Sequence, residues 1–372
     1  MQSKRKILIL FFYVLFTFFS VDYFNQLQYD IQIKRTSEDN WEEVKKAIKY
    51  QENLNFNRRI EFYKRKYKVK NIVACVFYGR KMYTEILFRY LDRHLKKNGG
   101  ILDKIIILNH IMGSKGNITI ESEFLRNYLD THVDGYEEFK FRTRDTYQML
   151  YSVLNDDDLI FKIDDDIVFI ANNTFENMVE DYFTNDRFIL SANVINHHTL
   201  SSVHAYMNMM LPFYESANKN YTLNLDDGKS INNNLSLFKK CVKNQDMWRK
   251  NEKCSVIAHE SFLYNIYRNN FNLDSYNFQF FKFFNKRTNS NERWRINFIL
   301  FRGKDLNKIS ILYPNVSDEE IITVLLTNIK NKFNFALGSA IVSHFSYYEH
   351  INYLKETNIL KKYDKLSLDY FK

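Results

Sequence analysis

Three consecutive aspartates, Asp164 to Asp166, stand between two runs of strand-forming apolar residues in the stretch Leu159 to Ile170. Adjacent carboxylates repel one another, and the repulsion is tolerable only when a cation or solvent takes up the charge. In an extended chain Asp164 and Asp166 point to the same side, because side chains alternate with a period of two. Two such carboxylates can hold Mn²⁺ or Mg²⁺, which fills its other positions with phosphate and water. The pattern therefore favours a metal site for a substrate that carries phosphate.

A solvated acidic turn between two strands is the competing interpretation of these residues. The two interpretations differ in the expected effect of replacing Asp164 and Asp166 by Asn. At a metal site the change relieves repulsion, so the metal-free protein should be as stable as before or slightly more stable, and Mn²⁺ should no longer stabilise it. In an acidic turn the change should alter neither activity nor the response to ligands.

Strand and helix patterns alternate around the aspartates. Residues 72–78, 102–110, 158–163 and 188–197 are apolar runs of the kind found in buried strands, and residues 82–100 repeat apolar side chains at helical spacing before Gly99 and Gly100. This alternation predicts an α/β domain with a mainly parallel sheet. Ligands bind such sheets at the carboxyl ends of the strands, and the aspartates follow one of these ends.

The N-terminus predicts a membrane anchor. Lys4, Arg5 and Lys6 precede an uncharged apolar run from Ile7 to Val21 that lacks a clear cleavage site. We expect residues 1–24 to form a cytoplasmic tip and an uncleaved signal anchor, with a cleaved signal peptide as the alternative. The basic flank then places the remainder in the lumen of the endoplasmic reticulum or Golgi, as a single-pass type II protein. Residues 25–70 read as a charged stem and 71–372 as the catalytic domain, with a mobile insertion at 215–250.

The cysteines and the basic residues fit this topology. Cys241 and Cys254 are close enough in sequence to form a disulfide in an oxidising lumen, and Cys75 lies in a predicted core strand as a free thiol. The segment Arg58 to Lys70 holds seven basic residues with aromatics between them. In a cytosolic protein that composition would suggest nucleic acid. Behind a membrane anchor it indicates a solvated stem, and we expect no nucleic-acid partner.

Several motifs together resemble the GT-A superfamily of nucleotide-sugar glycosyltransferases, and more closely an uncharacterised group of fungal-type members. The resemblance covers roughly residues 71–365 and depends on the predicted topology, the Asp-x-Asp motif and five segments: Gly79–Arg80, Asn98 to Lys104, Lys162 to Ile170, Ser191 to His197, and Gly338 to Ser346. It implies a GT-A-like, Rossmann-type mixed and mainly parallel sheet flanked by helices.

The resemblance also implies an activity. Such an enzyme moves a sugar from a nucleotide-sugar donor to a glycan, glycoprotein or glycolipid acceptor, with Mn²⁺ or Mg²⁺ between the two phosphates of the donor. In this chain Asp166 is the expected direct ligand, and His344, after the strand-like stretch that ends "GSAIVSHFS", is expected to be a further one. Asp164 is expected to contact the metal or the hydroxyls of ribose or sugar, and Asp165 to lie against the substrate.

Other candidate residues follow strands or precede helices. Arg80 is expected at the nucleotide, and Arg144, with Arg142, at phosphate. An inverting enzyme needs a carboxylate base, for which Glu260 at a predicted helix start is the first choice, before Asp246 and Asp305. Trp294 could stack on a sugar, although a core position suits it better. The side chains expected to bind sugar hydroxyls are Asn193, Asn196 and His197.

Three other functional classes compete with a glycosyltransferase. A catalytically inactive glycan- or nucleotide-binding protein of the same fold is the strongest, since a fold alone does not give activity. A two-metal phosphohydrolase would need more clustered His and Asp ligands than the sequence offers. A P-loop kinase is excluded, because "DGKS" at 227–230 has Leu223 where that loop requires glycine.

Overall fold

A computed structural model describes residues 56–109, 118–141, 147–211, 213–215, 221–223, 241, 248, 251–285, 289–313, 316–345 and 348–370. The chain divides into two compact units, Met1–Arg59 and Ile60–Lys372. The elements described below belong to the second unit.

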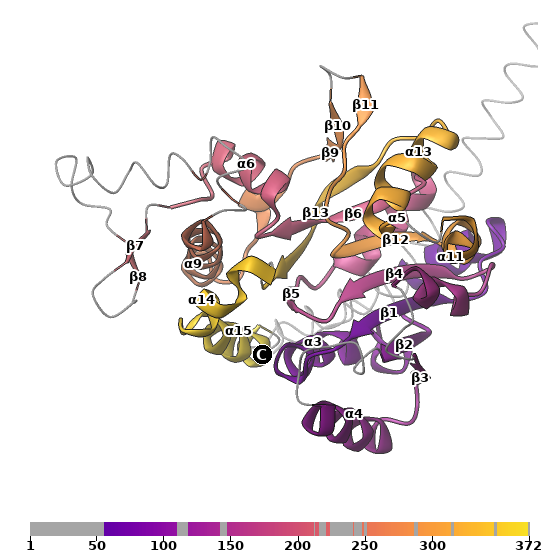
Figure 1. The fold of residues 1–372 in the computed structure, drawn as a ribbon, viewed down its shortest axis with the longest axis horizontal. Coiled ribbons are helices and arrows are strands. Elements are labelled where there is room, and N and C mark those ends of the chain that lie inside the picture. The colour runs from indigo at the N-terminus through magenta and orange to yellow at the C-terminus, as the bar shows by residue number, and fades with distance from the viewer. Residues whose placement is uncertain are drawn as a thin grey trace, which may run out of the picture. The chain divides into compact units, whose positions relative to one another are not determined.

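The centre of this unit is a nine-stranded mixed sheet (Figure 1). Its order is β3-β2-β1-β4-β12-β6-β13-β5, with β9 pairing beside β13. Six strands run in one direction, whereas β12, β5 and β9 are antiparallel to their neighbours. The strands are β1 Ile72–Tyr78, β2 Lys104–Asn109, β3 Tyr136–Lys140, β4 Leu159–Asp164, β5 Ile167–Ile170, β6 Leu190–Ile195, β9 Phe280–Lys282, β12 Phe298–Arg302 and β13 Phe335–His344. The predicted mixed and mainly parallel α/β sheet is confirmed.

The inner strands are buried on both faces, which explains their continuous apolar sequences. In β1 and β4 nearly every residue is buried, and β6 is buried along its whole length. Edge strand β3, with the sequence YEEFK, instead has no buried residue. Burial therefore follows the position of a strand in the sheet, as its composition suggests.

Helices flank the sheet because each presents one apolar stripe. In α3, Lys81–His94, the buried residues Tyr83, Leu87 and Tyr90 recur at helical spacing. The sheet curls so that edge strand β5 lies against α3 (Figure 1). At this contact the rings of Tyr90 and Phe169 lie 5.6 Å apart. The other helices used below are α4 Ile118–Thr131, α5 Thr174–Thr184, α6 His198–Tyr206, α9 Glu252–Arg268, α10 Gly303–Leu306, α12 Asp318–Glu320, α14 Ile351–Lys355 and α15 Ile359–Asp369.

Parallel pairing brings several polar segments to one edge of the sheet. The strands β1, β4, β6 and β13 all end there, and antiparallel β12 begins there beside Asn297, whose carbonyl accepts a hydrogen bond from the backbone of Asp164 at 2.9 Å. The three aspartates therefore lie at the carboxyl end of β4, as the sequence predicts.

The start of the compact unit includes residues from the expected stem. Lys64 forms an ion pair of 2.9 Å with Asp103, and the ring of Tyr67 stacks on Phe183 with centroids 4.7 Å apart. The unit begins at Ile60, before the boundary expected at residue 71. The expected anchor at 1–24, the stem up to residue 55 and most of the expected insertion at 215–250 lie outside the described residues. Among the helices that are described, none has the length and apolar character needed to cross a membrane.

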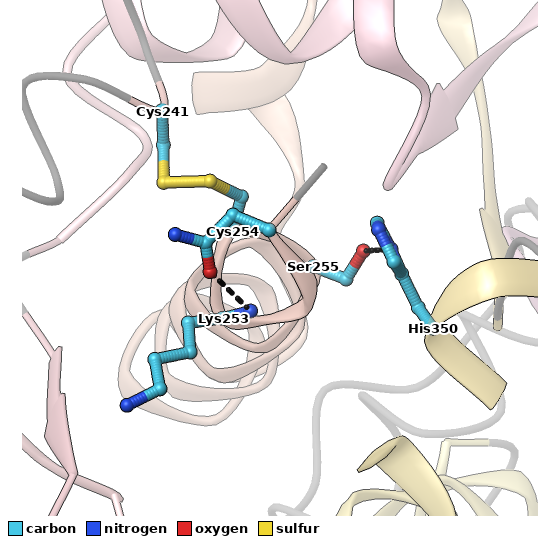
Figure 2. Close-up of a disulfide and its surroundings, with 6 residues drawn as sticks. Cys241, Lys253, Cys254, Ser255 and His350 are labelled. Atoms are coloured by element: carbon cyan, nitrogen blue, oxygen red, sulfur yellow. Dashed lines mark hydrogen bonds between the residues drawn. A yellow bond between two sulfur atoms is a disulfide. The ribbon is translucent and has the colours of Figure 1, made fainter. Parts of the chain in front are cut away.

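A disulfide joins Cys241 to Cys254, which lies in the first turn of α9 (Figure 2). Both cysteines are buried in an apolar cluster with Phe213, Trp248 and Ile257. Cys75 is a buried free thiol in β1. Both expectations for the cysteines are confirmed, and the disulfide ties the segment that contains Cys241 to a helix of the core.

Replacing Cys241 by Ser should lower the free energy of unfolding by roughly 3 kcal/mol, because the cross-link closes a loop of sequence separation 13 and restricts the unfolded chain. Urea unfolding of parent and variant measures this loss. Thiol titration in denaturant without reductant should find one thiol per chain in the parent, and the matched variant Cys75→Ala should have none. Three thiols in the parent would contradict the disulfide.

Candidate metal centre

The ends of β4 and β13 bring together two carboxylates and one imidazole. Asp164, Asp166 and His344 each offer one ligand atom, and these atoms all lie within 4.8 Å of one another. The Oδ1 atom of Asp166 is 3.3 Å from Nε2 of His344. The fold thus assembles the three ligands expected from the sequence, although His344 comes from a distant strand.

Asp166 is the most enclosed of the three. Its side chain is 3% exposed, and Oδ1 receives no hydrogen bond from any described residue, because the contact with His344 has the distance but not the geometry of one. Burial alone would raise the pKa of Asp166, but His344 and then Arg80 outweigh burial and hold the pKa well below its usual range. A buried carboxylate oxygen that accepts no hydrogen bond of good geometry, beside an imidazole nitrogen, is an arrangement that a bound cation would satisfy. The donor set therefore fits a divalent metal.

Arg80 forms ion pairs with two of the three aspartates, Asp165 and Asp166. Its Nε donates to both oxygens of Asp165 at 3.2 Å, and its guanidinium lies 3.0 Å from Asp166. The backbone N–H of Gly79 also donates to Asp165 at 3.0 Å. Asp165 is thus turned toward Arg80 and Gly79. The structure places Arg80 against two aspartates, whose charge it neutralises, and the nucleotide contact expected from the sequence stays a prediction.

Asp164 has its own cationic partner, which sequence reasoning missed. The ammonium of Lys162 contacts Oδ1 of Asp164 and donates to the carbonyl of Ile296 at 2.8 Å, while the amide of Asn297 donates to Oδ2 at 2.8 Å. Burial lowers the pKa of Lys162, but Asp164 and then Asp318 outweigh it, so the pKa is raised. A lysine two residues before Asp164 in a buried strand shares its face, and that spacing was the available signal.

The three polar residues at the end of β6 are buried and form hydrogen bonds with backbone groups inside the protein. Asn193, Asn196 and His197 are all fully buried. The amide of Asn193 donates to the carbonyls of Tyr276 and Gly338 at 3.0 and 3.1 Å. His197 caps α6 by accepting a hydrogen bond from Thr199 at 3.2 Å. These side chains hold the backbone around the site, where the sequence suggested contacts with sugar hydroxyls.

Glu260 lies in the middle of α9, and the expectation that it begins a helix is wrong. Its carboxylate forms an ion pair of 2.6 Å with Lys362 of α15. Asp305, in α10, follows the far end of β12, and Lys330 lies 3.7 Å from it. Arg142, Arg144 and Asp246 lie outside the described residues.

A cavity of about 250 Å³ is lined by His198, Arg293, Trp294, Arg295 and Glu319. Its lining segments are connected to the metal centre through the chain, since Asn297, two residues after Arg295, donates to Asp164, and His198 follows the end of β6. Arg293 and Arg295 each donate to Glu319 at 2.9 Å. Trp294 is 1% exposed and stacks on Phe283 at 4.3 Å, which confirms its core position. Sequence reasoning missed Glu319, because nothing local distinguishes it from an ordinary acidic helix start.

Comparisons with known proteins add little to this geometry. No protein-family model matches the chain, and no curated protein matches it. Among solved structures it is similar to a crystal structure of GalNAc-T7 with UDP, GalNAc and Mn²⁺, with 7% identity and a TM-score of 0.36. The match covers 76% of this chain and 44% of that chain. A similarity of this degree carries no argument, so the case for a function depends on the site.

Proposed function

We propose that the protein is a metal-dependent glycosyltransferase that uses a nucleotide-sugar donor. The observation that carries the proposal is the cluster of Asp164, Asp166 and His344 at the carboxyl edge of an α/β sheet. A cation held by few protein ligands keeps positions open for phosphate oxygens. The resemblance found in the sequence supplies the reaction class, and the geometry supports its metal ligands.

Each ligand has a defined part in this proposal. Asp166 and His344 would hold the cation through Oδ1 and Nε2, the two atoms that lie 3.3 Å apart. Asp164 is a quarter exposed, so it can contact either the cation or a hydroxyl of the donor. The chemistry that the metal supplies when bound is stabilisation of charge on the departing nucleoside diphosphate. Two oxygens and one nitrogen suit Mn²⁺ better than Mg²⁺, which prefers oxygen ligands.

The acceptor would occupy the cavity beside the metal centre, with Glu319 as the base that takes its proton. Glu319 lines this cavity and its side chain is 15% exposed, whereas the side chain of Glu260 is only 6% exposed and lines no cavity that the structure describes. Arg293 and Arg295 fix the orientation of the Glu319 carboxylate. A positioned base of this kind contributes roughly 10²–10⁴-fold to a rate.

Glu319→Gln should therefore lower transfer at least about a hundredfold while leaving Mn²⁺ affinity unchanged. Glu260→Gln is the matched comparison, and its expected effect is on stability, because Lys362 loses its partner. Initial rates with a competent donor and acceptor measure the first effect, and urea unfolding measures the second. Loss of transfer in Glu260→Gln alone would return the role of base to Glu260.

The disulfide supports a lumenal location. Disulfides persist in oxidising compartments and are rare in the cytosol, so the Cys241–Cys254 link suits the secretory pathway. We propose, with the predicted anchor at 1–24, a type II protein of the endoplasmic reticulum or Golgi whose acceptors are glycans, glycoproteins or glycolipids. A C-terminal tag should then resist protease in intact microsomes, and cleavage of the tag would refute this topology.

A metal-free nucleotide- or glycan-binding protein is the second candidate. The specific observation in its favour is that Lys162 and Arg80 already contact all three aspartates. Under this alternative the cationic side chains would balance the carboxylates permanently, and Mn²⁺ would have no effect.

One experiment separates the two candidates. The full chain, purified in detergent, is incubated with a panel of nucleotide sugars in Mn²⁺ or in EDTA, and release of nucleoside diphosphate is followed. The glycosyltransferase proposal expects turnover of at least one donor in Mn²⁺ and none in EDTA. Binding of donors without turnover, equal in both conditions, would establish the second candidate.

A further inference from the structure

A chain of buried hydrogen bonds starts and ends on the two neighbours of His344. The hydroxyl of Ser343 lies 2.8 Å from that of Tyr363 in α15, and the Tyr363 hydroxyl lies 2.9 Å from Nδ1 of His259 in α9. Nε2 of His259 is 2.7 Å from the carbonyl oxygen of Phe345. Ser343, Tyr363, His259 and Phe345 are each fully buried. Two helices therefore hold the backbone on both sides of one candidate ligand.

The chemistry of the acceptor fixes the direction of this chain. A carbonyl oxygen only accepts, so Nε2 of His259 must carry the proton that it donates to Phe345. Burial lowers the pKa of His259 to about 3, which leaves the ring neutral and its Nδ1 an acceptor. Tyr363 must then donate to His259, and Ser343 must donate to Tyr363. Each of these groups has one consistent role, as expected of a satisfied buried network.

A second set of contacts connects the same backbone to Asp166. The amide of Asn196 donates to the carbonyls of His344 and Phe345 at 3.2 and 3.0 Å. Asn196 has a φ of 63°, a left-handed conformation that asparagine tolerates better than most residues. The N–H of Phe345 donates to the backbone carbonyl of Asp166 at 2.8 Å. Movement of residues 343–345 would therefore change the spacing of both ligands.

We propose that His259 is a positioning residue for the metal centre, acting through the backbone of Phe345 to set the distance between His344 and Asp166. The proposal rests on the proposed function, since it assumes that those two residues bind the cation. Removing a group that orients a metal ligand without touching the metal typically lowers metal affinity about 10- to 100-fold. We expect the lower end, about tenfold, because Asn196 still holds Phe345.

Mn²⁺ titration of the full chain, followed by the electron paramagnetic resonance signal of free Mn²⁺, tests the proposal without any need for activity. His259→Leu should weaken Mn²⁺ binding about tenfold. His259→Gln, whose amide can still donate to Phe345, should recover most of the affinity. Tyr363→Phe keeps the ring and removes the hydroxyl that donates to His259, so it should lower Mn²⁺ affinity by less than His259→Leu does. This variant tests the proposal if His259→Leu does not fold.

His204→Leu is the matched control. His204 is also buried, with Nε2 at 2.7 Å from Asn193, and burial lowers its pKa to about 3. Its hydrogen bond to Asn193 and its ring contact with Tyr276 do not involve residues 343–345, so its loss should reduce stability and leave Mn²⁺ affinity unchanged. Equal affinities in parent, His259→Leu and Tyr363→Phe would overturn the positioning role, as would an equal loss in His204→Leu. A parent chain that binds no Mn²⁺ would instead overturn the metal centre and the proposed function.

Discussion

Replacing Asp166 by Asn should reduce sugar transfer by at least about a thousandfold and abolish the stabilisation of the protein by Mn²⁺ with nucleoside diphosphate. Charge stabilisation by a bound metal contributes several kcal/mol to such a reaction, and about 4 kcal/mol corresponds to three orders of magnitude. The buried Oδ1 of Asp166 accepts no hydrogen bond from the described residues, which leaves it available to bind the cation. In Asp166→Asn no other described carboxylate oxygen takes that position. Initial rates and thermal melts with and without ligand measure the two effects.

Asp181→Asn provides the control for this prediction. Asp181 in α5 also pairs with an arginine, at 2.8 Å from Arg187, but it belongs to no metal cluster that the structure describes. Binding raises stability only through affinity for the folded state, so parent and Asp181→Asn should show the same ligand-dependent shift. A Mn²⁺-dependent shift in Asp166→Asn equal to that of the parent would contradict the metal centre.

The fold could be predicted where local pattern determines structure. Residues 72–78 and 188–197 read as buried strands and form β1 and β6, and the stripe that includes Tyr83 and Tyr90 reads as a helix and forms α3. The position of the aspartates at a carboxyl end followed from the alternation of these elements. Strand β12 was not predicted as a partner of β4, since antiparallel insertion of a late strand between β4 and β6 depends on contacts distant in sequence.

The sequence identifies the polar residues near the site but does not reveal the role of each one. Asn196 and His197 follow a strand, which is where ligand-binding side chains occur, yet both are buried and hold backbone. A polar residue after a strand has the same sequence signature in either role. Glu260 is a similar case, because its partner Lys362 lies in another helix. Hydrogen-bond partners of this kind are a property of the tertiary structure, and no local pattern reveals them.

The balance of charge around the aspartates gave the largest difference from expectation. Considered alone, three adjacent carboxylates should repel, and their replacement by Asn should be neutral or stabilising in the absence of metal. The structure places Lys162 against Asp164, and Arg80 against Asp165 and Asp166. Loss of Asp164 therefore leaves the Lys162 ammonium without its carboxylate partner, so we expect the opposite sign for stability at this position.

Asp164→Asn should accordingly destabilise the metal-free protein by about 2–3 kcal/mol. Removing one member of a buried ion pair typically costs about 3–5 kcal/mol, because the other charge stays buried without compensation. The Lys162 side chain is only 5% exposed, whereas Asp164 is 25% exposed, and water near Asp164 reduces the loss. Urea unfolding in EDTA measures the free energy, and an unchanged slope with denaturant shows that both proteins unfold from comparable states.

The double variant Lys162→Met/Asp164→Asn decides whether the pair is the cause. Removing both charges eliminates the uncompensated ammonium, and replacement of a whole buried pair by apolar or neutral groups is often nearly neutral. We expect the double variant to lie within about 1 kcal/mol of the parent and to be more stable than Asp164→Asn alone. If Asp164→Asn is as stable as the parent, or more stable, repulsion among the aspartates outweighs their pairing. The ion pair between Lys162 and Asp164 would then contribute nothing to holding this edge of the sheet in place before a metal binds.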